Sequence, residues 1–253
     1  MNGISIGDFF THSNSVTGVT QEQYLQAKML VNTAEAFART TNQSVYIIDY
    51  IKKGFVYVSD SLALLCGEDT DKIREFGYEL YIRHVPEEEQ KMLLEINEAG
   101  FRLFNSFPEA ERKNYFISYD FNITCGRKKT LVNHKLTPFV LTDDGRILLA
   151  LCTISPSAKK EPGHVMMRHT GSDEYHEYDF DLHRWVQKKE KPLSELERGI
   201  LLLSARGYTM SQIALDVCKS VDTIKTCKRL LFERFEVTSI VEALTFATNC
   251  RLL

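Results

Sequence analysis

The last part of the chain, residues 193–253, is a series of short segments that each open with a helix-capping residue. In the first two, Glu or Gln stands three residues beyond the cap and completes a capping box, which satisfies backbone amides that the first helical turn leaves free. Apolar residues then recur at helical spacing. Helices this short are not stable in isolation, so the four segments are predicted to pack together as a four-helix bundle. The capping residues are Ser194, Thr209, Ser220, and either Thr238 or Ser239.

The second and third segments are joined by about three residues, which is the layout of a helix-turn-helix. In such a motif the second helix lies in the major groove of DNA, where its N-terminal side chains meet base edges. On residues 220–235 the apolar side chains Ile224, Leu231 and Phe235 share one side and are predicted to be core. Short polar and cationic side chains occupy the other side of the first turns.

Charge is distributed unevenly along the chain, which carries a net charge of −3. Residues 1–190 hold 22 Lys and Arg against 27 Asp and Glu, whereas residues 219–234 hold five against two. An acidic body with a locally basic C-terminal module is what DNA contact by that module requires.

The C-terminal sequence contains a spaced set of short motifs: Leu193-Ser194 with Glu197, Gly207-Tyr208-Thr209, Ile213-Ala214, Ser220 with Thr223-Ile224-Lys225, Arg234-Phe235-Glu236-Val237, and Glu242-Ala243. This set, over roughly a quarter of the chain, resembles the LuxR-type (GerE-like) helix-turn-helix family. Two departures stand out: Cys227 occupies the position of the family's usual His, and Glu236 that of its usual Gly. The second departure predicts a helix that ends without a left-handed glycine.

The resemblance implies a DNA-binding surface and a pairing helix. Lys225, Thr226 and Arg229 would face the groove. Residues nearer the DNA backbone would be Ser220, Thr223, Lys228, Thr209 and Ser211. Two copies would pair through the fourth helix, by Ile240, Val241, Leu244 and Ala247. The implied partners are double-stranded DNA with a near-palindromic operator, a second copy of the chain, and RNA polymerase.

The N-terminal body is predicted to have a PAS-like fold, so that the fold class is α+β. Two strands, several helices and three antiparallel strands follow in that order, and YVSDSLALLCGED and RHVPEEEQ resemble pieces of the PAS family. The predicted divisions are a disordered tail at 1–19, a helix at 20–42, the PAS-like domain at 43–160, an added β-hairpin at 161–185, a linker at 186–192 and the helix-turn-helix domain at 193–253.

No cofactor, metal or ligand-binding residue is predicted in this body. The six cysteines are dispersed without a CxxC pair, which is typical of reduced thiols rather than a zinc site. His84 and His134 are interpreted as structural residues. A phosphoacceptor receiver domain is not expected, because the chain lacks the early pair of acidic residues that such a domain needs. An acyl-homoserine-lactone receptor is disfavoured because the one tryptophan, Trp185, lies outside any pocket-like setting.

The sequence therefore predicts a cytoplasmic, bacterial-type transcription regulator in which a sensory or dimerisation domain controls a DNA-binding module. The signal, a small molecule or a protein, is not identified by the residues. The alternative is an adaptor that uses its helix-turn-helix to dock on another protein. An enzyme is not expected because no nucleophile elbow, P-loop or dinucleotide fingerprint appears. No membrane span or secretory signal is predicted either.

Overall fold

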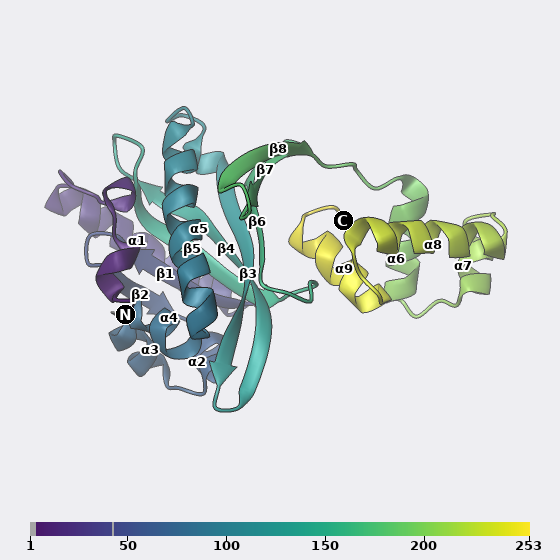
Figure 1. The fold of residues 1–253 in the computed structure, drawn as a ribbon, viewed down its shortest axis with the longest axis horizontal. Coiled ribbons are helices and arrows are strands. Elements are labelled where there is room, and N and C mark those ends of the chain that lie inside the picture. Colours follow the sequence, from purple (N-terminus) through teal and green to yellow (C-terminus); the bar gives the residue numbers. More distant parts are fainter. Residues whose placement is uncertain (1–3, 42) are drawn as a thin grey trace. The chain divides into compact units, whose positions relative to one another are not determined.

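The computed structural model describes residues 4–41 and 43–253, which form two compact units (Figure 1). The first, here called the body, comprises the chain up to Ser155 together with Glu161–Lys188. The second, the C-terminal unit, comprises Pro156–Lys160 and Lys189–Leu253. Each unit has its own apolar core.

The body is built on one eight-stranded sheet with the strand order β2-β1-β5-β4-β3-β6-β7-β8. Its first five members in this order, with helices inserted between β2 and β3, have the element order of a PAS fold that the sequence predicts. The strands are β1 Ser44–Asp49, β2 Gly54–Val58, β3 Tyr115–Cys125, β4 Lys128–Leu141, β5 Ile147–Pro156, β6 Gly163–His169, β7 Glu174–Asp179 and β8 Arg184–Lys189.

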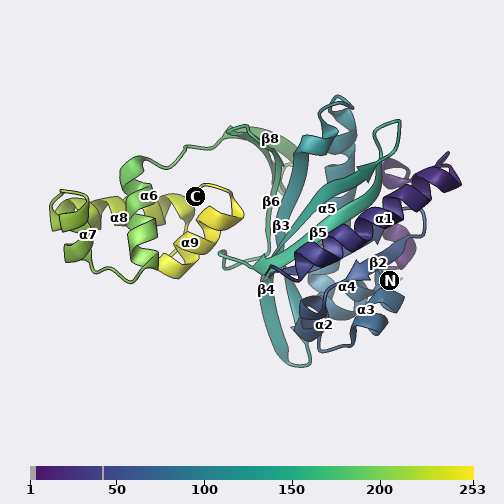
Figure 2. The same cartoon turned by 180° about the vertical axis from the view of Figure 1, so that it is seen from behind.

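Helices cover both faces of this sheet. The body's α-helices are α1 Gln21–Ala38, α2 Asp60–Cys66, α3 Thr70–Phe76, α4 Glu79–His84 and α5 Glu87–Ser106, and its short 3-10 turns are Ile6–Phe9, His12–Asn14 and Arg112–Asn114. The long helix α5 begins directly after Pro86, with three Glu residues in its first turn, where the helix dipole favours negative charge. Figure 2 shows α1 lying across the opposite sheet face from α5.

Side-chain alternation along β3 explains where the main core lies. Ile117, Tyr119, Phe121 and Ile123 alternate along the strand, are all buried, and belong to the same cluster as Phe101 of α5. Residues two apart on a strand point to the same face, so these four side chains form one wall of the core. On the other sheet face, a smaller cluster joins α1 to β1 and β5.

Residues 4–19 are not the disordered tail that the sequence predicts. Phe9 is only 3% exposed, and its ring centroid lies 5.6 Å from that of Tyr78 and 5.7 Å from that of Tyr81. The backbone carbonyl of Phe9 accepts hydrogen bonds from Asn14 and Asn97. The tail is ordered because it supplies an aromatic side chain to the core. Residues 1–3 of the predicted tail lie outside the described residues, as does residue 42 of the predicted helix.

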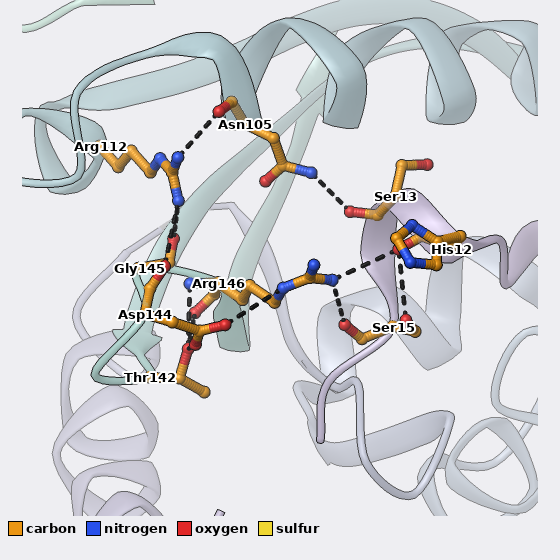
Figure 3. Close-up of polar contacts among 9 residues, drawn as sticks. All are labelled: His12, Ser13, Ser15, Asn105, Arg112, Thr142, Asp144, Gly145 and Arg146. Atoms are coloured by element: carbon orange, nitrogen blue, oxygen red, sulfur yellow. Dashed lines mark hydrogen bonds and ion pairs between the residues drawn. The ribbon is translucent and has the colours of Figure 1, made fainter. Parts of the chain in front are cut away.

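Polar contacts also hold this N-terminal segment against the body (Figure 3). Arg146 donates to the carbonyl oxygen of Ser15 at 2.8 Å, and Asn105 donates to that of Ser13 at 2.7 Å. Arg112 in turn donates to the carbonyls of Asn105 and Gly145. The segment is thereby tied both to the end of α5 and to the β4–β5 turn.

The predicted hairpin at 161–185 and linker at 186–192 also need correction. The chain forms three strands here, β6, β7 and β8, which extend the sheet beyond β3. The last strand runs to Lys189, so residues 186–189 of the predicted linker are sheet. Lys188 pairs with Glu177 at 2.6 Å, and Gln187 donates to Glu174. The lysine-rich stretch is an edge strand, where exposed lysines protect against pairing with other chains.

Every helix within residues 4–41 and 43–253 is too short or too polar to cross a membrane. The same residues hold no group of three or more His, Cys, Asp or Glu side chains that could bind a metal ion.

Candidate nucleic-acid interface

The C-terminal unit contains four capped helices, α6 Glu195–Ala205, α7 Met210–Asp216, α8 Val221–Phe235 and α9 Ile240–Asn249. The N-cap hydroxyl of each helix accepts a hydrogen bond from the backbone amide three residues on. The four caps are Ser194, Thr209, Ser220 and Ser239. The first two have complete capping boxes, as the sequence predicts.

Helices α7 and α8 form the helix-turn-helix. The turn between them passes through Cys218, which adopts a left-handed conformation with φ of 52°. Beneath the motif, Ile213 of α7 and Ile224 of α8 pack with Ile200 and Leu203 of α6. Leu231 and Phe235 belong to a second cluster that includes α9. The apolar side of α8 is therefore fully used inside the unit, and its other side is left to solvent.

The outward side of α8 carries the three residues predicted to face the groove. Lys225, Thr226 and Arg229 are all exposed, and the side chains of Lys225 and Arg229 are each 62% exposed. The diameter of an α-helix with its side chains, about 10–12 Å, matches the width of the major groove, so this exposed side of α8 could fit into it.

Each of these two cations has an acidic partner on the same helix, which the sequence-based prediction missed. Lys225 Nζ lies 3.7 Å from Asp222, and Arg229 Nη1 lies 2.7 Å from Glu233. The spacings of three and four residues could have revealed both pairs. Such exposed pairs contribute about 0–1 kcal/mol, so DNA phosphates and bases can replace them readily. Leu230, 52% exposed beside Arg229, was missed as well.

The residues predicted to contact the DNA backbone fall into two groups, those that take part in helix capping and those that do not. The hydroxyls of Thr209 and Ser220 serve as helix caps, and Thr223 bonds with the Ser220 hydroxyl at 2.8 Å. Ser211 is exposed on α7. Lys228 is half-buried, with its ammonium 5.3 Å from the ring centre of Phe232. Their contacts with DNA stay predictions.

The predicted pairing residues on α9 do not share one exposed surface. Ala247 is fully buried in the core of its own unit, so it is not available to a partner, and its inclusion was wrong. Ile240 and Leu244 are partly buried against the same core. Val241 is 69% exposed. The apolar stripe on α9 mostly holds α9 to α6 and α8.

A half-buried ion pair fixes α8 to α6. Arg234 Nη1 lies 3.2 Å from Glu197, the residue that completes the α6 capping box. Burial acts to raise the pKa of Glu197, but hydrogen bonds from Ser194 and the charge of Arg234 outweigh it and lower the pKa below its ordinary value. A lowered folded-state pKa stabilises the unit above the unfolded pKa, and this contribution is lost as the pH falls through the folded pKa.

We therefore expect Glu197→Gln to destabilise α6 and α8 at neutral pH by about 1 kcal/mol. The amide keeps the shape of the capping box but lacks the charge. Hydrogen exchange of the α6 and α8 amides should show this difference at pH 7 and show it disappearing once Glu197 is protonated in the wild-type chain. A difference that stayed constant down to acid pH would mean that the charge of Glu197 has no part in stability.

The helix α8 ends without a glycine, as the sequence predicts, yet its last turn keeps the left-handed backbone. Glu236 itself takes the left-handed conformation, with φ of 56° and ψ of 43°, that the family's glycine would occupy. A residue with a Cβ is strained there, whereas glycine is not. Glu236→Gly should therefore raise the free energy of unfolding of the C-terminal unit by roughly 1 kcal/mol, measured by thermal unfolding. Glu236→Ala removes the same charge but keeps the Cβ, and should give no such gain.

The described part of the body has two small cavities beside α5 and a larger hollow of about 350 Å³ between α1 and the β4–β5 turn. Two small cavities, of about 40 and 20 Å³, adjoin α5 and share Asn97, Tyr119 and Leu136. Each has room for a water molecule or so. A larger ligand beside α5 would need the side chains around these two small cavities to move apart.

Both histidines that the sequence singles out in the body have protein partners. His134 is fully buried, with Nε2 2.7 Å from the hydroxyl of Tyr46, which also bonds with Tyr81. Burial lowers the pKa of His134 to about 3, so the ring is neutral at physiological pH. His84 Nδ1 lies 3.0 Å from the carbonyl oxygen of Thr124.

Comparison with known proteins gives structural likenesses only. No family model matches the chain, and no curated protein matches it. Among solved structures, it is similar to the phage VqmA–DPO complex, with 13% identity, a TM-score of 0.31 and coverage of 88% of each chain. It is similar to a Vibrio cholerae VqmA dimer, described among LuxR-type receptors, with 13% identity, a TM-score of 0.35 and coverage of 87% of each chain.

The body alone is similar to the PAS domain of the fruit-fly ELK potassium channel. The identity is 14%, the TM-score is 0.37, and the match covers 50% of this chain and 95% of that domain. At such scores these likenesses add no weight to the geometry, which identifies a PAS-like body and a helix-turn-helix unit by itself.

Proposed function

We propose that the protein is a DNA-binding transcription regulator in which the PAS-like body controls a helix-turn-helix that reads the major groove. One observation carries the proposal. The second helix of the motif directs Lys225, Thr226 and Arg229 into solvent. The side chains of Ile224, Leu231 and Phe235 on its other side are buried in the core. An exposed helix face with short polar and cationic residues near its N-terminus suits base edges and phosphates.

Within this proposal the cations have different tasks. Arg229 and Lys225, nearest the centre of the exposed side, contact bases, where a bidentate Arg pairs best with guanine. Lys228 contacts phosphate, together with the first turns of α7 and α8 at Ser211 and Thr223. Phosphate contacts set the register of the helix, and base contacts supply the sequence preference.

Two copies act together on DNA. One short helix makes too few base contacts for a unique site, and linking two heads multiplies their weak affinities. A two-fold arrangement places the half-sites about one helical turn apart and makes the operator near-palindromic. Val241, the exposed apolar residue of the predicted pairing set on α9, is available for contact between heads. The body receives the signal in the cytoplasm and sets the spacing of the heads.

Selection of genomic DNA fragments by the purified full-length chain tests the proposal. The expected result is enrichment of a two-fold symmetric sequence. If the full chain enriches nothing, residues 189–253 should be tested alone, because recovered binding would mean that the body masks the heads. If neither binds, the regulator proposal is wrong and the adaptor alternative takes its place.

The adaptor alternative is less well supported by the outer side of α8. A protein-docking surface usually has an apolar centre with few charges. Here the exposed Leu230 stands among Arg229, Glu233 and Thr226. That mixture suits a polar, charged partner such as DNA better than an apolar one.

A further inference from the structure

Leu230 is a large apolar side chain on the same exposed side of α8 as the two cations that are predicted to face the groove. It is 52% exposed, whereas Ile224, Leu231 and Phe235 of the same helix are at most 1% exposed. One exposed leucine is ordinary on a protein surface. Leu230, however, directly follows Arg229, which the proposed function places against a base. The surface that would read DNA therefore has an apolar part.

The exposed side of α8 consists of two rows of residues with different chemistry. Residues three or four positions apart are neighbours along one side of a helix. Lys225 and Arg229 form a cationic row, in which each side chain has an acidic partner. Thr223, Thr226 and Leu230 follow the same spacing, are all exposed and carry no charge. Threonine and leucine both bear methyl groups, so this second row suits apolar contacts.

The major groove offers a different base to each of these rows. Thymine presents a C5 methyl group there beside its O4 acceptor, whereas guanine presents the N7 and O6 acceptors. Apolar side chains contact the thymine methyl group, and cationic side chains contact guanine. The cationic row of α8 therefore suits guanine, and the uncharged row suits thymine.

The spacing along the helix places these two bases side by side. Consecutive Cα atoms are about 3.8 Å apart, and consecutive base pairs are stacked about 3.4 Å apart. Because Leu230 directly follows Arg229, it comes within reach of the base pair next to the guanine that Arg229 contacts. Thr226 precedes Leu230 by four residues and is its neighbour on the helix surface, so it supplies a second methyl group at the same place.

We propose that Leu230, together with Thr226, selects a thymine next to the guanine that Arg229 reads, by burying the C5 methyl group of that thymine. The inference rests on the proposed function, because it requires α8 to lie in the major groove. It adds a sequence preference, in which each half-site contains a guanine with a neighbouring thymine. Removal of the methyl group from water favours this contact, and cytosine is disfavoured because it has no methyl group at that position.

Replacement of the thymines in the selected operator by uracil, one at a time, tests the proposal. Uracil pairs as thymine does and lacks only the C5 methyl group. At the thymine next to the guanine, uracil should weaken binding of the full-length chain about fourfold, and about 15-fold when both half-sites are changed. Uracil at the other thymines should have little effect. Fluorescence anisotropy at fixed salt measures the dissociation constants.

Leu230→Ala should remove this response to the methyl group. The variant should keep its folded circular dichroism spectrum, because Leu230 is half exposed and alanine favours helix. It should bind the thymine and uracil operators equally, about as weakly as the wild type binds the operator with uracil in both half-sites. Leu230→Met keeps an apolar side chain and should retain the preference for thymine.

Leu182→Ala is the matched control. Leu182 is 56% exposed between β7 and β8 of the body, so the same truncation there should leave the response to uracil unchanged. A bound operator without a thymine next to the guanine would overturn the proposal, as would a wild-type chain that tolerates uracil at every position.

The proposal would also be wrong if Leu230→Ala remained as sensitive to uracil as the wild type. In each of these cases the chain still binds its operator, so the proposed function would stand. Failure of both the full-length chain and residues 189–253 to bind DNA would instead remove the proposed function and this inference together.

Discussion

Replacing both Lys225 and Arg229 with alanine is expected to abolish sequence-selective DNA binding while leaving the chain folded. Both side chains are exposed, and their only ion pairs in the described part of the chain are with Asp222 and Glu233 on the same helix. A lost base contact costs about 1–3 kcal/mol, so losing two should weaken specific binding by at least about 30-fold. Titration of the selected operator with both proteins at fixed salt measures the loss.

A control variant with the same loss of charge distinguishes base contacts from general electrostatic attraction to DNA. Lys191→Ala with Arg251→Ala removes two exposed cations that lie outside α8. This pair should weaken binding to every sequence alike and preserve the preference for the operator. Equal loss of selectivity in both double variants would contradict the assignment of α8 as the reading helix.

Phe9→Ala is expected to destabilise the body by about 3–5 kcal/mol. The ring is 3% exposed and packs between Tyr78 and Tyr81, so its removal leaves a cavity in an aromatic cluster. Chemical unfolding followed by the fluorescence of Trp185, which packs on Tyr178 within the body, reports the change.

Ile6→Ala provides the comparison for this loss. Ile6 lies in the same 3-10 turn but is 38% exposed, so its truncation should cost well under half as much. Similar small losses for Phe9→Ala and Ile6→Ala would mean that the N-terminal segment is not part of the folded core in solution.

The helix-turn-helix could be predicted from sequence because its signals are local. The caps at Ser194, Thr209 and Ser220 lie within three residues of the groups they satisfy. The core positions Ile224, Leu231 and Phe235 follow from helical spacing within one segment. Neither inference needs knowledge of distant parts of the chain.

The sequence-based predictions were wrong where contacts between distant parts of the chain determine the structure. The partners of Phe9 lie far along the sequence, on α4 and just before it, so the N-terminal segment gives no local sign that it is ordered. The apolar spacing on α9 predicts that one side of the helix is buried, but not which residues bury it. Ala247 is buried in the core of its own unit. The lysines of β8 resemble a linker because edge strands and linkers favour the same residues.

The same limit applies to the acidic partners of the two cations that are predicted to face the groove. Their spacing is visible in the sequence, yet only the structure shows that Arg229 and Glu233 are in contact at 2.7 Å.

Interference by dimethyl sulfate on the selected operator tests whether α8 reads bases in the major groove. The reagent methylates guanine N7 in the major groove and adenine N3 in the minor groove, which are acceptors on opposite sides of the duplex. We expect N7 methylation at one guanine in each half-site to block binding of the wild-type chain. Arg229→Ala should bind weakly and no longer respond to that methyl group. Interference confined to adenine N3, or none at either base, would contradict a helix α8 that reads the major groove.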